Sequence, residues 1–118
     1  MSDRPTYLLL YDILDALDNI SLYIKDVDFN NFSSNSMIRN AVERNIEIIG
    51  EASNKIPEAF RKSNPEIEWH KPIAMRNRLI HGYFAIDIPM LWNTITVILP
   101  PFRDSIIKLI ESSNRELN

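Results

Sequence analysis

Glycine is almost absent from this chain, since only Gly50 and Gly82 occur among its 118 residues. Hairpins depend on glycine at turn positions with positive φ, so this scarcity disfavours a β fold. Apolar residues instead recur at helical spacing over four long segments. The length and the 45% hydrophobic content suit one globular domain. We therefore predict an all-α fold, with residues 1–118 forming a single helical domain.

The first half of the chain contains two long apolar stripes separated by a polar segment. Stripes of this kind pack against each other in antiparallel bundles, and short connections favour neighbouring helices. Proline lacks a backbone N–H and clashes with the preceding turn, so it ends the helix before it. We expect a first helix over about 5–25, followed by a polar connector over 26–34. A second helix is capped near Ser33 or Ser34 and is stopped by Pro57. A short extra helical turn with a loop then covers 57–65.

Two positions interrupt the stripe of the second helix. Asn45 is polar where an apolar residue is expected. Gly50 lies inside the helix, where glycine costs about 1 kcal/mol relative to alanine. A glycine retained at such a cost indicates that another part of the chain packs closely against Gly50.

The third long helix is expected to run from about Glu66 or Pro72 to His81. Its end is marked by Gly82, which can adopt the left-handed conformation that follows many helices. Tyr83 can then fold back onto the last turn. The chain thus predicts a helix C-terminus at which several polar side chains gather.

The last helix opens at Asp87 and Pro89. Its apolar stripe keeps its phase across Pro100 and Pro101, and each proline removes one backbone hydrogen bond. We therefore predict one helix kinked at these prolines. The whole is an antiparallel four-helix bundle with a short extra helix.

Charge is unevenly distributed along the chain. The net charge of −3 argues against a protein that simply coats nucleic acid. Residues 1–60 carry ten acids and five bases, whereas residues 61–81 carry five bases and two acids. A cationic site on an acidic body can hold one or two phosphates, although a solvated helix face would give the same pattern.

The composition also limits cofactors and location. Without cysteine, disulfides, thiol catalysis and cysteine-ligated zinc are excluded. The two histidines, His70 and His81, are not expected to meet, so we predict no metal site and no cofactor. The start of the chain does not resemble a signal peptide, and no apolar run approaches the length of a membrane span. We expect a cytoplasmic protein with no membrane contact.

The basic segment ends in a compact polar motif. Arg76 is followed directly by Asn77, four residues separate Arg76 from His81, and one residue separates His81 from Tyr83. An arginine and a histidine together can bind a phosphate and move a proton without a metal. A structural interpretation also fits, because His81 could complement the helix dipole and Tyr83 could cap the helix end.

Over essentially its whole length the chain resembles the HEPN nucleases, and within them the HepT-like toxins of prokaryotic toxin–antitoxin pairs. The resemblance lies in the arginine-x4-histidine-x-tyrosine motif. It extends to the surroundings of that motif, namely residues 48–52, Trp69, Asp87 and Trp92. It implies an all-α homodimer that cuts RNA without metal. It also implies a cognate antitoxin resembling a minimal nucleotidyltransferase, which transfers AMP to the motif tyrosine, here Tyr83.

The residues of the motif suit this chemistry. RNA carries its own nucleophile, the 2′-hydroxyl, so the enzyme must move protons and stabilise the phosphate. His81 can act as base or acid, and Arg76 can pair with the phosphate oxygens. Asn77 could orient the phosphate or the imidazole of His81. Arg78 is assigned to substrate binding or a surface ion pair. Glu51 could pair with Arg76 or Arg78, or support the site.

Helix geometry constrains how the site is completed. Residues five apart are turned by about 140° beyond a full turn, so Arg76 and His81 do not share one face of a helix. They converge only because the helix ends at His81 or because two copies of the motif meet. A two-fold dimer would supply a second proton carrier, so we predict a composite cleft at a homodimer interface.

Two other functions are compatible with the sequence. The chain could be a non-catalytic helical partner of a nucleotidyltransferase, binding nucleotide or protein through the same basic segment. It could also be a plain dimerisation module, which would leave the polar cluster unexplained. An intact set of Arg76, His81 and Tyr83 favours the ribonuclease.

Overall fold

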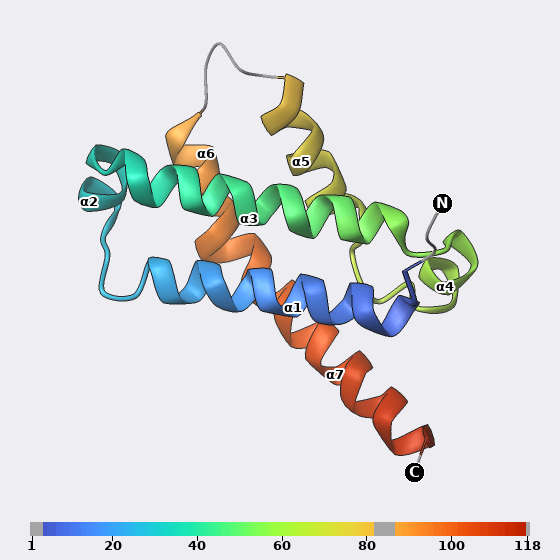
Figure 1. Cartoon of the computed structure of the whole chain (residues 1–118). Helices are drawn as coiled ribbons and strands as arrows, with labels where there is room; N and C mark the ends of the chain where they lie inside the picture. Colours follow the sequence, from blue (N-terminus) through green and yellow to red (C-terminus); the bar gives the residue numbers. More distant parts are fainter. Residues whose placement is uncertain (1–3, 82–86, 118) are drawn as a thin grey trace.

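Two long helices, α1 (Thr6–Tyr23) and α3 (Ser36–Lys55), lie side by side and antiparallel at the centre of the molecule (Figure 1). The computed structural model describes residues 4–81 and 87–117, with side chains up to residue 113. Each helix turns its apolar stripe toward the other, because burying apolar surface is the main favourable term in folding. The fully buried side chains of this pair include Ile13, Val42, Ile46 and Ile49. The prediction of two long helices here is confirmed.

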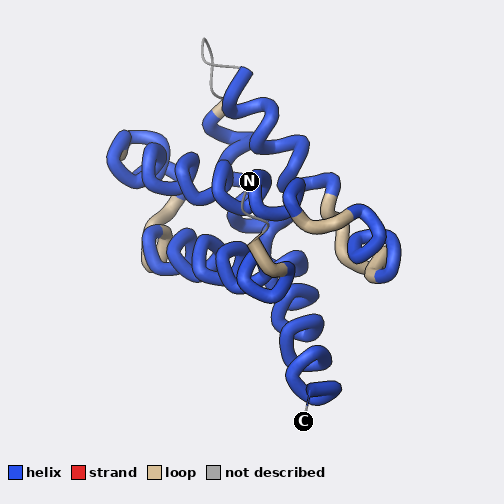
Figure 2. Tube along the Cα trace, turned by 45° about the vertical axis from the view of Figure 1, so that its right-hand side comes forward, coloured by secondary structure: helices blue, strands red, loops and turns tan. Residues whose placement is uncertain are grey.

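Helix α5 (His70–His81) packs against α3, on a side of α3 that does not face α1. The last helical segments are α6 (Ile88–Asn93), η1 (Thr94–Ile98) and α7 (Leu99–Leu117). They follow one another as a single rod that packs against α1 through α7 (Figure 1). Figure 2 shows that the described residues form helices and loops without a strand. The predicted all-α class is confirmed.

The rod passes through both prolines without breaking. Immediately before them, η1 is a π-helical segment, in which the Leu99 amide donates to the carbonyl of Thr94 five residues back. Such a wide turn is one of the known ways in which helices accommodate an irregular hydrogen-bond pattern. The carboxylate of Asp87 accepts from the Met90 amide, so the helix begins where the sequence predicts. The predicted single helix is therefore present, and its irregular hydrogen bonds lie in Thr94–Ile98, just before Pro100.

The polar connector predicted over 26–34 is wrong in part, because it contains the short helix α2 (Phe29–Ser34). The Asp28 carboxylate caps this helix by accepting from the Asn31 amide at 2.8 Å. Phe32 is fully buried, with its ring centroid 4.9 Å from that of Trp92. Phe29, at the start of α2, also packs edge-on against Trp92 at 6.1 Å, so aromatic contacts anchor a segment whose other residues are mostly polar. The cap of α3 is Asn35, which accepts from the Ile38 amide at 3.1 Å, one residue beyond the predicted position.

The short extra helix is α4 (Glu58–Ser63), which follows Pro57 as predicted. A loop then leads to α5, and the Trp69 indole fixes it by donating to the Asn64 carbonyl at 3.1 Å. Asn45 is only 6% exposed and is satisfied there. Its amide donates to the Ala41 carbonyl at 2.8 Å and accepts from the Asn19 amide at 3.2 Å, so the interruption of the stripe is a polar contact between α1 and α3.

Within residues 4–81 and 87–117, none of the helices is apolar over the length needed to cross a membrane.

Candidate active site

Helices α3 and α5 pack closely against each other at Gly50. A Cβ built on Gly50 would lie 2.2 Å from Cβ of Arg76 and 2.6 Å from the carbonyl oxygen of Pro72. Contacts this short do not occur in real proteins, so no larger residue fits without moving α5. The predicted close packing at Gly50 is confirmed, and the residue it packs against is the arginine of the motif. Gly50 therefore fixes the stem of Arg76.

The guanidinium of Arg76 is half-buried and only partly satisfied. Its Nη1 donates to the side-chain oxygen of Asn77 at 3.2 Å. Its Nε is buried and has no hydrogen-bond partner among the described residues. A buried donor without a partner costs free energy, and it is often explained by a ligand or an ion. The fork of Arg76 thus retains an unused donor suited to a phosphate oxygen.

His81 is the last residue of α5, and its side chain is exposed to solvent. In the described part of the chain, no hydrogen bond joins it to Arg76. On a regular helix, residues five apart are turned by about 140° relative to each other. Arg78 and Asn77 are also exposed. The predicted residues Arg76, Asn77, Arg78 and His81 therefore all lie in the second half of α5.

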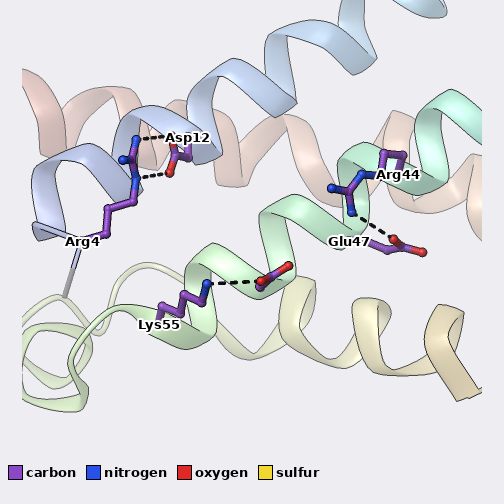
Figure 3. Close-up of polar contacts among 6 residues, drawn as sticks. Arg4, Asp12, Arg44, Glu47 and Lys55 are labelled. Atoms are coloured by element: carbon purple, nitrogen blue, oxygen red, sulfur yellow. Dashed lines mark hydrogen bonds and ion pairs between the residues drawn. The ribbon is translucent and has the colours of Figure 1, made fainter. Parts of the chain in front are cut away.

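Glu51 belongs to a different part of the molecule. Its carboxylate pairs with Lys55 at 3.2 Å, one turn further along α3 (Figure 3). It lines a groove of about 330 Å³ between α1 and α3, together with Asp12 and Arg4. Figure 3 shows the guanidinium of Arg4, just before α1, joined to the carboxylate of Asp12 on α1. The predicted ion pair of Glu51 with Arg76 or Arg78 is therefore wrong, because Gly50 faces α5 and the next residue is turned by about 100° toward α1.

Cations of the basic segment divide into two groups. Lys62 pairs with Glu58 at 3.2 Å, and Lys71 pairs with Glu68, whose pKa is lowered by that hydrogen bond. Arg61, Arg76 and Arg78 have no carboxylate partner among the described residues. The three arginines are therefore the uncompensated positive charges of this segment.

The sequence did not single out Arg61, which lies on α4. It lines a groove that also reaches Asn77. The signal was present in the charge of residues 61–81, but only the fold shows which of those bases face one groove. Gly82 and Tyr83, with the predicted helix cap, lie outside the described residues.

An all-α fold with an arginine and a histidine near one helix end is the combination that the sequence predicts for a class of small helical ribonucleases. A family model described as "Ribonuclease HepT-like" matches residues 13–109. The chain therefore belongs to the HepT-like family, as its motif predicts.

Relatives with similar lengths carry consistent names. "Putative RNase MJ1380" of Methanocaldococcus jannaschii is 42% identical over 106 residues, covering 90% of this chain and 97% of that protein. "Putative RNase MJ0125" of the same organism is 38% identical over 94% of this chain and 96% of its own length. "Probable ribonuclease HepT" of Thermococcus cleftensis is 38% identical over 85% of this chain and 91% of its own length. No solved structure matches the chain.

Proposed function

We propose that the protein is a metal-independent RNA endonuclease that acts as the toxin of a toxin–antitoxin pair. One observation carries the proposal: Arg76 is held by Gly50 at the base of a helix end that presents His81, and its Nε lacks a partner. Membership of the HepT-like family, and the ribonuclease names of the relatives, support RNA as the substrate. No part of this mechanism requires a cofactor.

The reaction uses the 2′-hydroxyl of the substrate. An imidazole of His81 removes its proton, the 2′-oxygen forms a bond to the adjacent phosphorus, and the bond from phosphorus to the 5′-oxygen breaks. A protonated imidazole gives a proton to that leaving oxygen, so the products are a 2′,3′-cyclic phosphate and a 5′-hydroxyl. Arg76 stabilises the charge that builds on the non-bridging oxygens. Asn77, bound to Arg76, holds the guanidinium in place.

The cleft is completed by a second copy of the chain. Within one chain Arg76 and His81 face different directions, and a single histidine would have to serve as both base and acid. A large apolar side chain stands exposed within the motif, since Ile80, on α5, is 38% exposed. Covering such side chains favours association, and a two-fold axis at α5 would bring two motifs together.

The proposal is tested by expressing three forms in cells: wild type, Arg76→Ala and His81→Ala. Wild type should arrest growth and fragment RNA, while both variants should leave growth and RNA intact, because each lacks one part of the chemistry. RNA integrity is read on gels from matched protein levels. Harmless behaviour of the wild type would count against the toxin, and equal fragmentation by all three would count against the assigned residues.

An antitoxin of the nucleotidyltransferase type is proposed to transfer AMP to Tyr83. This tyrosine follows His81 by two residues in the chain. A bound AMP would bring a negative phosphate and bulk to the site of Arg76, which would exclude RNA.

Tyr83→Phe is therefore expected to keep the toxicity of the wild type but to resist the antitoxin. Growth is measured with and without the nucleotidyltransferase, and the mass of the purified protein shows whether AMP is attached. Tyr11→Phe, at an exposed tyrosine of α1, is the matched control and should remain neutralised. If Tyr83→Phe is still neutralised, the antitoxin acts by another route.

A further inference from the structure

A groove of about 520 Å³ runs between α4 and α5, beside the motif. Its volume lies in the range of sites that hold small molecules or single nucleotides. Polar side chains from three helices line it: Asn54 of α3, Arg61 and Lys62 of α4, and His70 and Asn77 of α5. The groove is formed within one chain, so it exists independently of any dimer.

The charge of this groove is positive. Glu58 is the one carboxylate among its lining residues, and it is already paired with Lys62. That pair is exposed, with 76% and 72% of the Lys62 and Glu58 side chains accessible, so it contributes little to stability. Arg61 has no carboxylate partner in the described chain, and its buried Nε has no hydrogen-bond partner there. An anion in the groove would satisfy Arg61 and could displace Glu58 from Lys62.

The groove is continuous with the motif through Asn77. This amide accepts from Arg76 and also forms part of the groove wall. His70 lies seven residues before it, about 10 Å along the same helix. A chain of phosphates that has one member at Arg76 could therefore place its neighbours along α5 toward Arg61. Side-chain amides and an exposed imidazole beside a cationic path are the groups that bind unpaired bases.

We propose that this groove binds the single-stranded part of the RNA next to the phosphate that is cut. Arg61 binds one backbone phosphate through its guanidinium, and Lys62 contributes a second charge. His70 offers a face on which a base stacks, and Asn54 and Asn77 offer hydrogen bonds to base or ribose. The inference rests on the proposed ribonuclease function, and it assigns the substrate as RNA that is unpaired beside the cleavage position.

The test measures RNA binding without cleavage. In a His81→Ala background, Arg61→Gln and Lys62→Gln are combined, and the protein is titrated against a fluorescent ten-nucleotide single-stranded RNA at several salt concentrations. Binding should weaken about tenfold at low salt, and the slope of log affinity against log salt should become shallower by about 1.4, or 0.7 per lost phosphate contact. The control combines Lys25→Gln, just after α1, with Lys108→Gln, on α7. Both lysines are exposed, so this variant should bind RNA like the His81→Ala parent.

Several outcomes separate the groove from the nuclease. Unchanged RNA affinity and salt slope in the Arg61/Lys62 variant would overturn the assignment of the groove to RNA. The same conclusion would follow if this variant lost binding to the antitoxin but kept its binding to RNA. Lys62→Gln alone, at an exposed position, covers the case in which Arg61→Gln impairs folding, which helix content would reveal. A wild type that binds RNA through the groove but never cuts it would overturn the proposed function and leave the groove standing.

Discussion

His81→Ala is expected to slow cleavage of RNA by about 10²- to 10⁴-fold, the usual contribution of a positioned acid or base. The imidazole is exposed at the end of α5, where no described side chain stands ready to replace it. Its removal should leave the fold intact, because it makes no contact with the core. The loss should therefore appear in kcat, measured with a single-stranded RNA under conditions in which both proteins are folded.

The other histidine provides the comparison. His70 lies at the start of α5, away from the reacting position, so His70→Ala should raise KM for long RNA while changing kcat little. The same size of kcat loss in both variants would mean that His81 has no special part in proton transfer.

The proposed composite cleft adds a further expectation about mixed dimers. If each site needs His81 from both chains, wild type coexpressed with a tenfold excess of His81→Ala forms about one fully competent dimer in a hundred. If each chain works alone, about one chain in eleven remains active. The residual activity per wild-type chain thus differs about tenfold between the two cases. Activity proportional to the wild-type fraction would contradict the shared site.

The fold could be predicted largely from apolar spacing and helix caps. Four long stripes, Pro57 and the Asp87 cap determined the long helices, because those signals act locally. Helix α2 was missed, since its one buried anchor, Phe32, depends on Trp92 about sixty residues later. The π-helical segment η1 was also missed, because the response of a backbone to two prolines depends on its packing.

The site residues remain a prediction from the sequence, and their arrangement required the fold. The motif spacing indicated Arg76 and His81, and the geometry of a regular helix predicts that they do not share a face. The partner of Glu51 could not be predicted, because the sequence offers both Lys55, one turn along the same helix, and the arginines of α5. Arg61 required the fold, because only the tertiary structure places Arg61 and Asn77 in the walls of one groove.

Gly50→Ala is expected to destabilise the protein by about 1–3 kcal/mol, the range found when extra atoms are forced into a packed interior. In an ordinary helix interior the same change would stabilise by about 1 kcal/mol, so the sign is diagnostic. The new methyl would have to occupy space held by Cβ of Arg76 and the backbone carbonyl of Pro72. A side chain could rotate away, but these atoms move only if α5 moves.

The measurement is the free energy of unfolding from denaturant titration. Asn40→Ala, at an exposed position of the same helix, is the control and should be neutral or slightly stabilising. Because Arg76 is the residue displaced, folded Gly50→Ala should also cut RNA more slowly than Asn40→Ala does. A Gly50→Ala variant as stable and as active as the control would mean that α5 can shift without cost, and that Arg76 is not held in place by α3.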